Sequence, residues 1–258
     1  MRTIHATRYV TPLREGGSLP AVVEGDDDGL YVLKFRGAGQ GAKALVAELV
    51  AGGIARTLGL PMPEIVLAEL DGDLARNEPD AEIQALIRAS AGLNLALDFL
   101  PGSVAFDPAV ERPDARLAAA IVWFDAFVMN VDRTPRNVNL LTWHRRLMLI
   151  DHGASLYFHH DFERAERAVT EPFARIREHV LLPFAGAIAE VDAPLAAKLD
   201  AGVLAGILAE VPAAWLDPQP GAAEADRLRA RYVDILSRRL AARDAFVQEA
   251  IRARDGHV

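Results

Sequence analysis

Residues 130–153 read NVDRTPRNVNLLTWHRRLMLIDHG, a polar stretch followed by two apolar segments around a second turn. Pro135 fixes its own φ and disfavours helical geometry at Thr134, so the polar stretch from Asp132 to Asn137 cannot be helical. The segments on either side of the second turn favour two paired strands. This stretch therefore predicts a stiff polar loop that leads directly into a β-hairpin.

The predicted hairpin brings polar side chains together. Its turn, near Trp143–Arg146, is centred on about residue 144, the midpoint between Asn137 and Asp151. Residues directly opposite on antiparallel strands lie about 5 Å apart at Cα, so Asn137 and Asp151 are expected to meet near Asp132. Such oxygen ligands suit Mg²⁺, which commonly binds one or two carboxylates plus substrate phosphates. Alternatively, the three residues only form turns.

Composition limits the class of protein. The chain has 258 residues, enough for one large domain or two lobes sharing a cleft, and it is 51% hydrophobic and 25% charged, as globular proteins are. The net charge of −8 gives no general attraction to nucleic acid or to anionic membranes. The absence of cysteine excludes disulfides and thiolate sites and fits a reducing compartment. With no signal peptide and no long apolar run, we expect a cytoplasmic protein without membrane or nucleic-acid partners.

The segments around the loop indicate a strand-rich first part and a helical second part. Residues 21–24 and 30–35 favour a hairpin, 44–58 a helix that ends at Gly59 and Pro61, and 63–70 and 93–106 two further strands. The last of these breaks at residues 101–102, Pro-Gly. The nearly all-apolar segment 114–130 predicts a buried central helix. Helical sequence follows from residue 171, interrupted by DPQPG at 217–221.

Two charged residues in the first part lie on apolar faces. Lys34 shares a strand face with Leu30 and Val32, which is unusual unless the lysine points into a cleft. Glu48 lies on a helix face that is otherwise apolar, beside Leu49. The alternative is that both are ordinary surface charges.

Two glycine-rich segments are candidates for a phosphate-binding loop. REGGSLP at 14–20 precedes a strand, and its backbone N–H groups at Gly16, Gly17 and Ser18 can face a phosphate, although an ordinary turn fits equally well. GAGQGAK at 37–43 lacks the Gly-Lys-Ser/Thr of a Walker motif, so we interpret it as a flexible lead-in to the Glu48 helix.

Three stretches together resemble HipA-type bacterial kinases, whose fold is related to that of phosphoinositide kinases. They are NVDRTPRN at 130–137, IDHG at 150–153 and AELVAGGIARTLGLPMPEIVLAEL at 47–70. The first keeps the Asp-x-x-x-x-Asn spacing of kinase catalytic loops, and the second stands in place of Asp-Phe-Gly. Thr134 departs from the family, which usually has histidine there.

The resemblance implies an α+β, two-lobed protein-kinase-like fold. Its small β-rich N-lobe with one main helix would span residues 1–97, a hinge 98–104, and a larger helical C-lobe with the catalytic hairpin 105–258. HipA toxins usually carry an extra N-terminal subdomain, which we expect this chain to lack because it starts almost at the glycine segment.

The resemblance also implies functional roles. Asp132 would be the catalytic carboxylate, Lys34 would reach the phosphates of ATP with Glu48 orienting it, and Asn137 and Asp151 would hold Mg²⁺. The nucleotide contacts would come from Gly16, Gly17, Ser18 and Lys34 at the phosphates, and from the backbone of Asp98, Phe99 and Leu100 at the adenine.

The resulting hypothesis is an ATP- and Mg²⁺-dependent kinase that phosphorylates a hydroxyl group on a protein or a small molecule. A nucleotide-binding pseudokinase, favoured by Thr134, and an AMP-transferring enzyme on the same fold are the alternatives. Acidity and the lack of a basic cluster in the sequence argue against a lipid headgroup or RNA as acceptor. The oligomeric state is left open.

Two further features do not change this hypothesis. The stretch YFHHDF contains His159, His160 and Asp161, but adjacent histidines on a strand point to opposite sides and rarely chelate one metal. The basic segment 227–254 predicts an amphipathic helix with Tyr232 and Leu236 on its apolar face, packed on the helical lobe.

Overall fold

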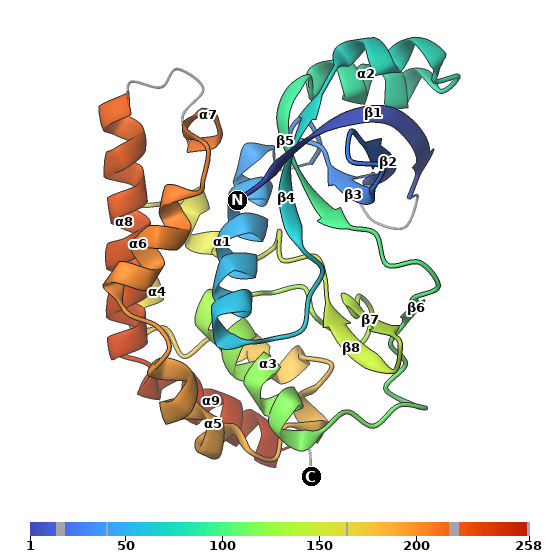
Figure 1. The fold of residues 1–258 in the computed structure, drawn as a ribbon. Coiled ribbons are helices and arrows are strands. Elements are labelled where there is room, and N and C mark those ends of the chain that lie inside the picture. Colours follow the sequence, from blue (N-terminus) through green and yellow to red (C-terminus); the bar gives the residue numbers. More distant parts are fainter. Residues whose placement is uncertain (14–18, 40, 164, 217–221, 257–258) are drawn as a thin grey trace.

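The computed structural model describes residues 1–13, 19–39, 41–163, 165–216 and 222–256. A β-rich N-terminal part is followed by a helical C-terminal part, with helix α1 standing between them (Figure 1). The expected α+β organisation, with strands gathered in the first part and helices in the second, is present.

Five strands of the N-terminal part close into a barrel in the order β1-β2-β3-β5-β4. The strands are β1 (Thr3–Pro12), β2 (Ala21–Gly25), β3 (Leu30–Lys34), β4 (Ile65–Leu70) and β5 (Gly92–Asp98). Strand β1 was not predicted, and its parallel pairing with β4 closes the barrel. The short helix α2 (Ala81–Ala89) lies between β4 and β5.

Helix α1 (Ala42–Leu58) packs closely on the barrel because it contains two glycines. A Cβ at Gly52 would lie 2.2 Å from Ile65 Cδ1, and one at Gly53 would lie 2.7 Å from Ile207 Cγ2. A larger residue at 52 would therefore push α1 away from β4. The helix ends at Gly59, which has the left-handed φ of 82° that suits a helix C-terminus.

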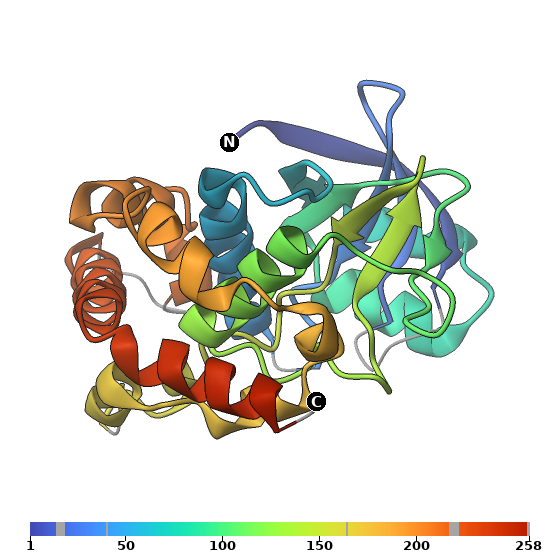
Figure 2. The same cartoon turned by 90° about the horizontal axis from the view of Figure 1, so that it is seen from below.

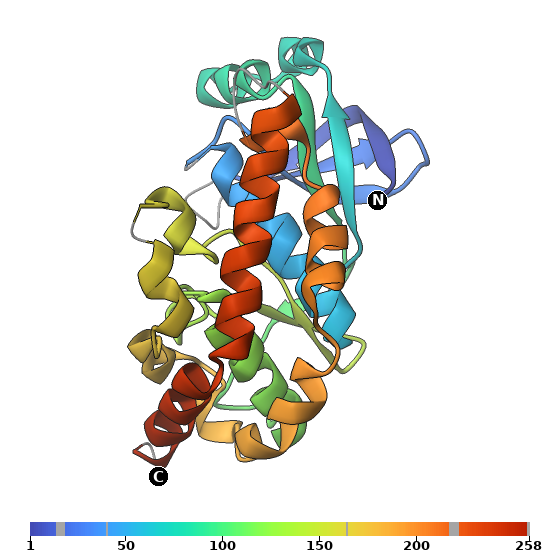
Figure 3. The ribbon, with the colours of Figure 1, turned by 90° about the vertical axis from the view of Figure 1, so that its left-hand side faces the viewer.

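The predicted central helix is α3 (Ala115–Val128), begun by Asp114, whose side chain accepts from the Arg116 and Leu117 amides. Trp123, Phe124 and Phe127 on this helix are fully buried. The helices that follow it are α4 (Ala165–Thr170), α5 (Ile188–Ala196), α6 (Ala201–Ala209), α7 (Ala213–Leu216), α8 (Ala222–Ala241) and α9 (Asp244–Asp255), arranged as Figures 2 and 3 show. None of the described helices is both long and apolar enough to cross a membrane.

The single tail helix predicted for 227–254 is two helices. Helix α8 ends at Ala241 and α9 begins at Asp244, so that Phe246 reaches the core, with its ring centre 5.6 Å from that of Trp123. Tyr232 and Leu236 of α8 are buried, as expected.

Buried Arg239 on α8 connects the end of α3 with α4 and the segment after it. Its guanidinium donates only to backbone carbonyls and forms no hydrogen bond to a carboxylate of the described residues. Its guanidinium donates to the carbonyls of Ala126 and Phe127 in the last turn of α3, and to those of Ala168 and Glu171. The carbonyls at a helix C-terminus lack intrahelical partners, so Arg239 satisfies them and complements the helix dipole.

A small second sheet lies beside the central helix. It contains β6 (Val104–Ala105), β7 (Leu140–Trp143) and β8 (Arg146–Leu149), and β7 and β8 form the hairpin predicted from the sequence. Strand β6 follows β5 after five residues, so the segment between the barrel and this sheet is short.

Candidate active site

The hairpin turns more tightly than the sequence analysis assumed. Trp143 pairs with Arg146, and the turn consists of His144 and Arg145 alone, both with positive φ (47° and 61°). A two-residue turn with two left-handed residues matches the twist of a hairpin. The centre of the hairpin therefore lies between residues 144 and 145, half a residue beyond the expected centre at 144. Each strand residue consequently pairs with a partner one position away from the expected one.

The expected pairing of Asn137 with Asp151 is therefore wrong. The Ile150 amide donates to the Asn139 carbonyl at 3.2 Å, so Asn139 stands opposite Ile150 at the open end of the hairpin. Asp151 follows directly, with a positive φ of 56°. The sequence analysis missed Asn139, which a two-residue turn at 144–145 would have indicated.

Asn137 instead belongs to a compact turn in the loop. Thr134 and Asn137 bond to each other's carbonyls at 2.9 and 3.1 Å, with Pro135 at the corner. The side-chain amide of Asn137 donates to Asp132 Oδ2 at 2.7 Å. The side-chain amide of Asn139 donates to the backbone carbonyl of Asp132 at 3.4 Å. Both asparagines thus hold Asp132, one through its carboxylate and one through its backbone.

Three elements bring Lys34, Glu48 and Asp151 together. Lys34 Nζ at the end of β3 forms an ion pair with Asp151 Oδ1 at 2.8 Å, and its side chain is 12% exposed. Glu48 on α1 is buried and accepts the His152 amide at 2.8 Å through Oε2. The ion pair of Lys34 is thus with Asp151 and not with Glu48, whose Oε1 has no hydrogen-bond partner among the described residues.

The electrostatics of this cluster favour a charged lysine. Burial lowers the pKa of Lys34, but the charges of Glu48 and Asp151 outweigh it and raise that pKa overall. Burial would raise the pKa of Asp151, yet Lys34 lowers it. Burial, helped by the charge of Asp151, raises the pKa of Asp132 against the hydrogen bond from Asn137. Asp132 is therefore the more basic of these two aspartates.

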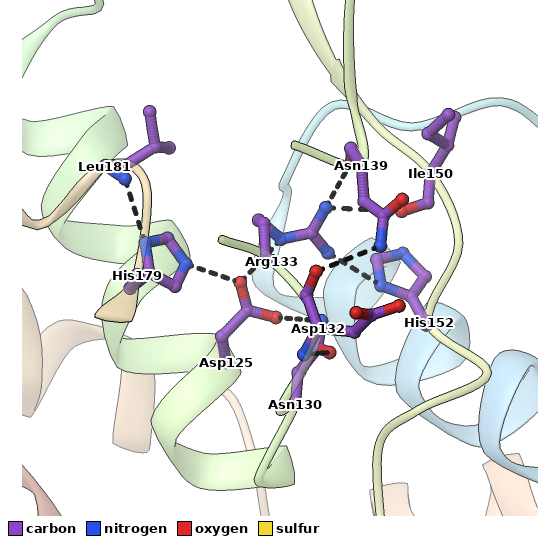
Figure 4. A network of polar contacts seen from close by, with 9 residues as sticks. All are labelled: Asp125, Asn130, Asp132, Arg133, Asn139, Ile150, His152, His179 and Leu181. Carbon is purple, nitrogen blue, oxygen red and sulfur yellow. Dashed lines mark hydrogen bonds and ion pairs between the residues drawn. The ribbon is translucent and has the colours of Figure 1, made fainter. Parts of the chain in front are cut away.

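A buried network fixes the loop to the hairpin (Figure 4). Arg133 Nε donates to Asp125 Oδ2 on α3 at 2.6 Å, while its Nη atoms donate to the carbonyls of Asn139 and Ile150. Asp125 also accepts from His179 Nε2 at 2.8 Å. Burial would raise the pKa of Asp125, but Arg133 and His179 outweigh it and hold that pKa well below its usual value. Arg133 therefore sets where Asp132 and Asn139 lie relative to α3.

Two buried histidines are neutral. His152 accepts from Arg133 Nη2 at 3.1 Å through Nδ1, and burial together with Arg133 lowers its pKa to about 3. His159 contacts the Tyr232 hydroxyl at 2.9 Å, and burial, followed by His160 and Lys43, lowers its pKa to about 3 as well. His159 is thus part of the core and not of a solvated polar loop.

Acid sensitivity of folding follows from these values. An unfolded histidine binds a proton below about pH 6.5, whereas buried His159 does so only near pH 3, so its stabilising effect is lost as pH falls from 6.5 towards 3. At pH 5 the loss is about 2 kcal/mol per such histidine. We therefore expect His159→Phe to lose about 2 kcal/mol less free energy of unfolding than wild type between pH 7.5 and 5, measured by urea titration. Exposed His144→Phe is the control, and an identical pH dependence of wild type and His159→Phe would contradict the prediction.

The backbone amide of Leu100, shortly after β5, is an unused donor. The Asp98 amide donates to the Glu64 carbonyl and the Phe99 amide to the Leu30 carbonyl, both at 2.9 Å. The Leu100 amide makes no hydrogen bond to a described residue. Of the three expected adenine-contacting positions, only Leu100 thus offers a free N–H.

Part of the predicted site lies outside the described residues, namely Gly16, Gly17 and Ser18. Among the residues that the structure does describe, no group of three histidine or acidic side chains is arranged to hold a metal.

Comparisons with known proteins agree with the geometry. A family model described as HipA-like kinase matches residues 7–249. The fold is similar to that of a Helicobacter pylori proinflammatory kinase, CtkA, with 14% identity, coverage of 97% of this chain and 98% of that chain, and a TM-score of 0.55. It is also similar to the Golgi casein kinase with Mn/ADP bound, with 13% identity, coverage of 93% and 74%, and a TM-score of 0.53. No curated protein matches the sequence.

Proposed function

Because the chain belongs to the HipA-like kinase family, we propose that it transfers the γ-phosphate of ATP to a hydroxyl group, with Mg²⁺ bound at Asp151. The observation that carries the proposal is the convergence of Lys34 and Asp151, 2.8 Å apart, next to Asp132 on a loop held by buried Arg133. Phosphoryl transfer needs positioning and charge neutralisation more than covalent chemistry, and this cluster supplies both.

The residues divide the task. Lys34, kept charged by its two acidic neighbours, would bind phosphate oxygens. Asp132, whose pKa is raised and whose carboxylate is oriented by Asn137, would accept the proton of the acceptor hydroxyl. The Leu100 amide would donate to the adenine. We keep the glycine segment with Gly16, Gly17 and Ser18 as the proposed phosphate loop.

The donor set fits a hard divalent cation. Asp151 supplies a carboxylate, and Asn139 stands beside it with its amide nitrogen already bonded to the Asp132 carbonyl, which leaves Asn139 Oδ1 as an acceptor. The metal would neutralise phosphate charge. The Golgi casein kinase structure holds Mn and ADP, which is consistent with such a site. We propose Asn139 with Asp151 as the metal pair and Asn137 as the residue that orients Asp132, in place of the Asn137 ligand inferred from spacing.

The two asparagines can be separated by metal affinity. We expect Asn139→Gly, which suits the positive φ of 49° at this position, to weaken Mn²⁺ binding in the presence of ADP about tenfold or more. Asn139→Asp, which keeps an oxygen ligand, should restore binding. Asn137→Ala should leave Mn²⁺ affinity close to wild type and move the acid limb of kcat/KM to higher pH, because it removes a hydrogen bond that lowers the pKa of Asp132. Electron paramagnetic resonance of free Mn²⁺ measures the first effect, and equal affinities in all three variants would contradict the assignment.

The activity itself is tested with ATP labelled separately at the γ and α phosphates. Wild type with Mg²⁺ is expected to transfer or release γ-label, and Asp132→Asn to lose this by about 10²-fold or more. Transfer of α-label instead would identify an AMP-transferring enzyme. ATP binding without any turnover would identify a pseudokinase, and no thermal stabilisation by ATP would reject the nucleotide site altogether.

A further inference from the structure

A cavity of about 1020 Å³ lies away from the candidate active site. Its lining includes none of Lys34, Glu48, Asp132 or Asp151. It is bordered by the end of α1 with residues 59–64, by residues 106–117 that lead into α3, and by β8 with the β7–β8 turn, elements that can be followed in Figure 1. None of the proposed catalytic steps uses this cavity.

Four arginines line the cavity, Arg56, Arg112, Arg145 and Arg146, and we call it the arginine pocket. All four are exposed, and none forms an ion pair with a described carboxylate. Arg112 lies over the Phe184 ring at 5.4 Å and donates to the Pro108 carbonyl. The side chains of the other three arginines make no hydrogen bond to any described residue. Their guanidinium donors are therefore available to a ligand.

The acidic residues of the pocket are already engaged elsewhere. Glu64 forms an ion pair with Arg2 at 3.1 Å, and Glu111 accepts the Thr142 hydroxyl at 2.6 Å. Asp114 caps α3 through backbone amides. The lining thus holds four arginines against three carboxylates, one of which is paired with Arg2, and keeps a small excess of positive charge on a chain whose net charge is −8.

The floor of the pocket is apolar and partly aromatic. Leu60, Phe106, Leu117, Trp143 and Met148 contribute to it. The Trp143 indole N–H donates to the Pro101 carbonyl at 3.1 Å, which fixes the ring. A volume of this size is at the upper end of the range for small-molecule sites, about 300–1000 Å³. The lining of the pocket thus combines apolar and aromatic side chains with several guanidinium groups.

We propose that the arginine pocket binds a small organic polyphosphate that is distinct from the phosphate donor. Each guanidinium group can donate two parallel hydrogen bonds to the oxygens of one phosphate. Four such groups suit a ligand with several phosphates better than a ligand with one carboxylate. The organic part would lie on the apolar floor. The pocket is also tied to the elements of the active site, because the Leu149 amide donates to the Pro61 carbonyl at 2.8 Å and Asp151 lies two residues beyond. Ligand binding there does not depend on the proposed kinase activity.

The test uses inorganic tripolyphosphate as the probe, titrated calorimetrically into the full chain with EDTA present. Wild type is expected to bind one equivalent, with an affinity that falls as salt is added. Arg56→Ala/Arg146→Ala should bind about tenfold more weakly or worse, because each lost charged hydrogen bond weakens affinity by about that factor. Arg88→Ala/Arg167→Ala, which removes two exposed arginines elsewhere, should bind as wild type does.

A fourth protein separates the two sites. Lys34→Met removes the proposed phosphate-binding lysine of the active site and should leave tripolyphosphate binding unchanged. Loss of binding in Lys34→Met would show that the anion occupies the active site and would overturn the proposal. Equal affinity of wild type and Arg56→Ala/Arg146→Ala, or no binding at millimolar anion, would overturn it as well. Thermal unfolding checks that each variant is folded. The arginine variants are expected to fold because their replaced side chains are exposed.

Discussion

Asp151→Asn is expected to reduce transfer of the γ-phosphate by about 10³-fold while leaving the protein folded. The substitution removes the carboxylate that we assign to the metal and that forms the ion pair with Lys34. Asparagine has the same shape and tolerates the positive φ of 56° at this position, so the backbone need not move. In this variant the negative charge of Glu48 still lies near Lys34, which limits the loss in free energy of unfolding. Release of labelled phosphate under saturating ATP measures the effect.

The control for Asp151→Asn is Asp244→Asn, an exposed carboxylate in the first turn of α9. It should retain wild-type activity. A second measurement compares thermal stabilisation by ADP with and without Mn²⁺, and Asp151→Asn should lose only the metal-dependent part. Activity within tenfold of wild type, or unchanged Mn²⁺ dependence, would contradict the role of Asp151.

Arg133→Met is expected to have the largest effect on folding. Arg133 is 1% exposed, and its removal leaves the Asp125 carboxylate buried without a cation. Breaking a buried pair in this way costs about 3–5 kcal/mol. The Ile150 carbonyl loses its Arg133 donor at the same time, and the Asn139 carbonyl keeps only the Ile150 amide. Urea unfolding should show this loss, and any folded fraction should be inactive because Asp132 is no longer positioned.

The comparison variant is Arg238→Met, which removes two exposed ion pairs, with Glu166 and Asp234, and should cost less than about 1 kcal/mol. Adding Asp125→Asn to Arg133→Met removes the orphaned charge, so the double variant should be more stable than Arg133→Met alone. If Arg133→Met and Arg238→Met unfolded at similar urea concentrations, the buried network would not carry the stability assigned to it.

Local patterns in the sequence were sufficient to identify most of the elements and several of the charged residues that meet in the candidate site. Apolar periodicity indicated α1 and α3, and lysine and glutamate on apolar faces indicated Lys34 and Glu48. The pairing inside the site was harder to predict. A half-residue error in the hairpin centre shifts the strand pairing by one residue, and such a shift turns every side chain to the other face of the sheet. Pairing of Lys34 with Asp151 depends on how β3 and β8 meet, which no local pattern contains.

Features made by distant residues could not be predicted. Strand β1 has exposed residues at most positions and pairs with β4 some sixty residues away, so its own sequence shows little apolar alternation. The arginine pocket draws Arg56, Arg112 and Arg145–Arg146 from three separate segments, and a search for basic clusters along the chain does not find it. Its position becomes apparent only when α1, the α3 lead-in and the hairpin are placed together.

The carbonyl contacts of Arg239 have a consequence for the order in which the protein matures. The last turn of α3, which leads directly into the catalytic loop, has the Ala126 and Phe127 carbonyls satisfied by a side chain more than one hundred residues later. During synthesis the barrel and α1 leave the ribosome well before residue 239, whereas the end of α3 lacks this partner until then. The nascent chain thus completes the proposed phosphoryl-transfer loop only after residue 239 has been added, and a ribosome-bound fragment that ends before α8 is expected to be inactive.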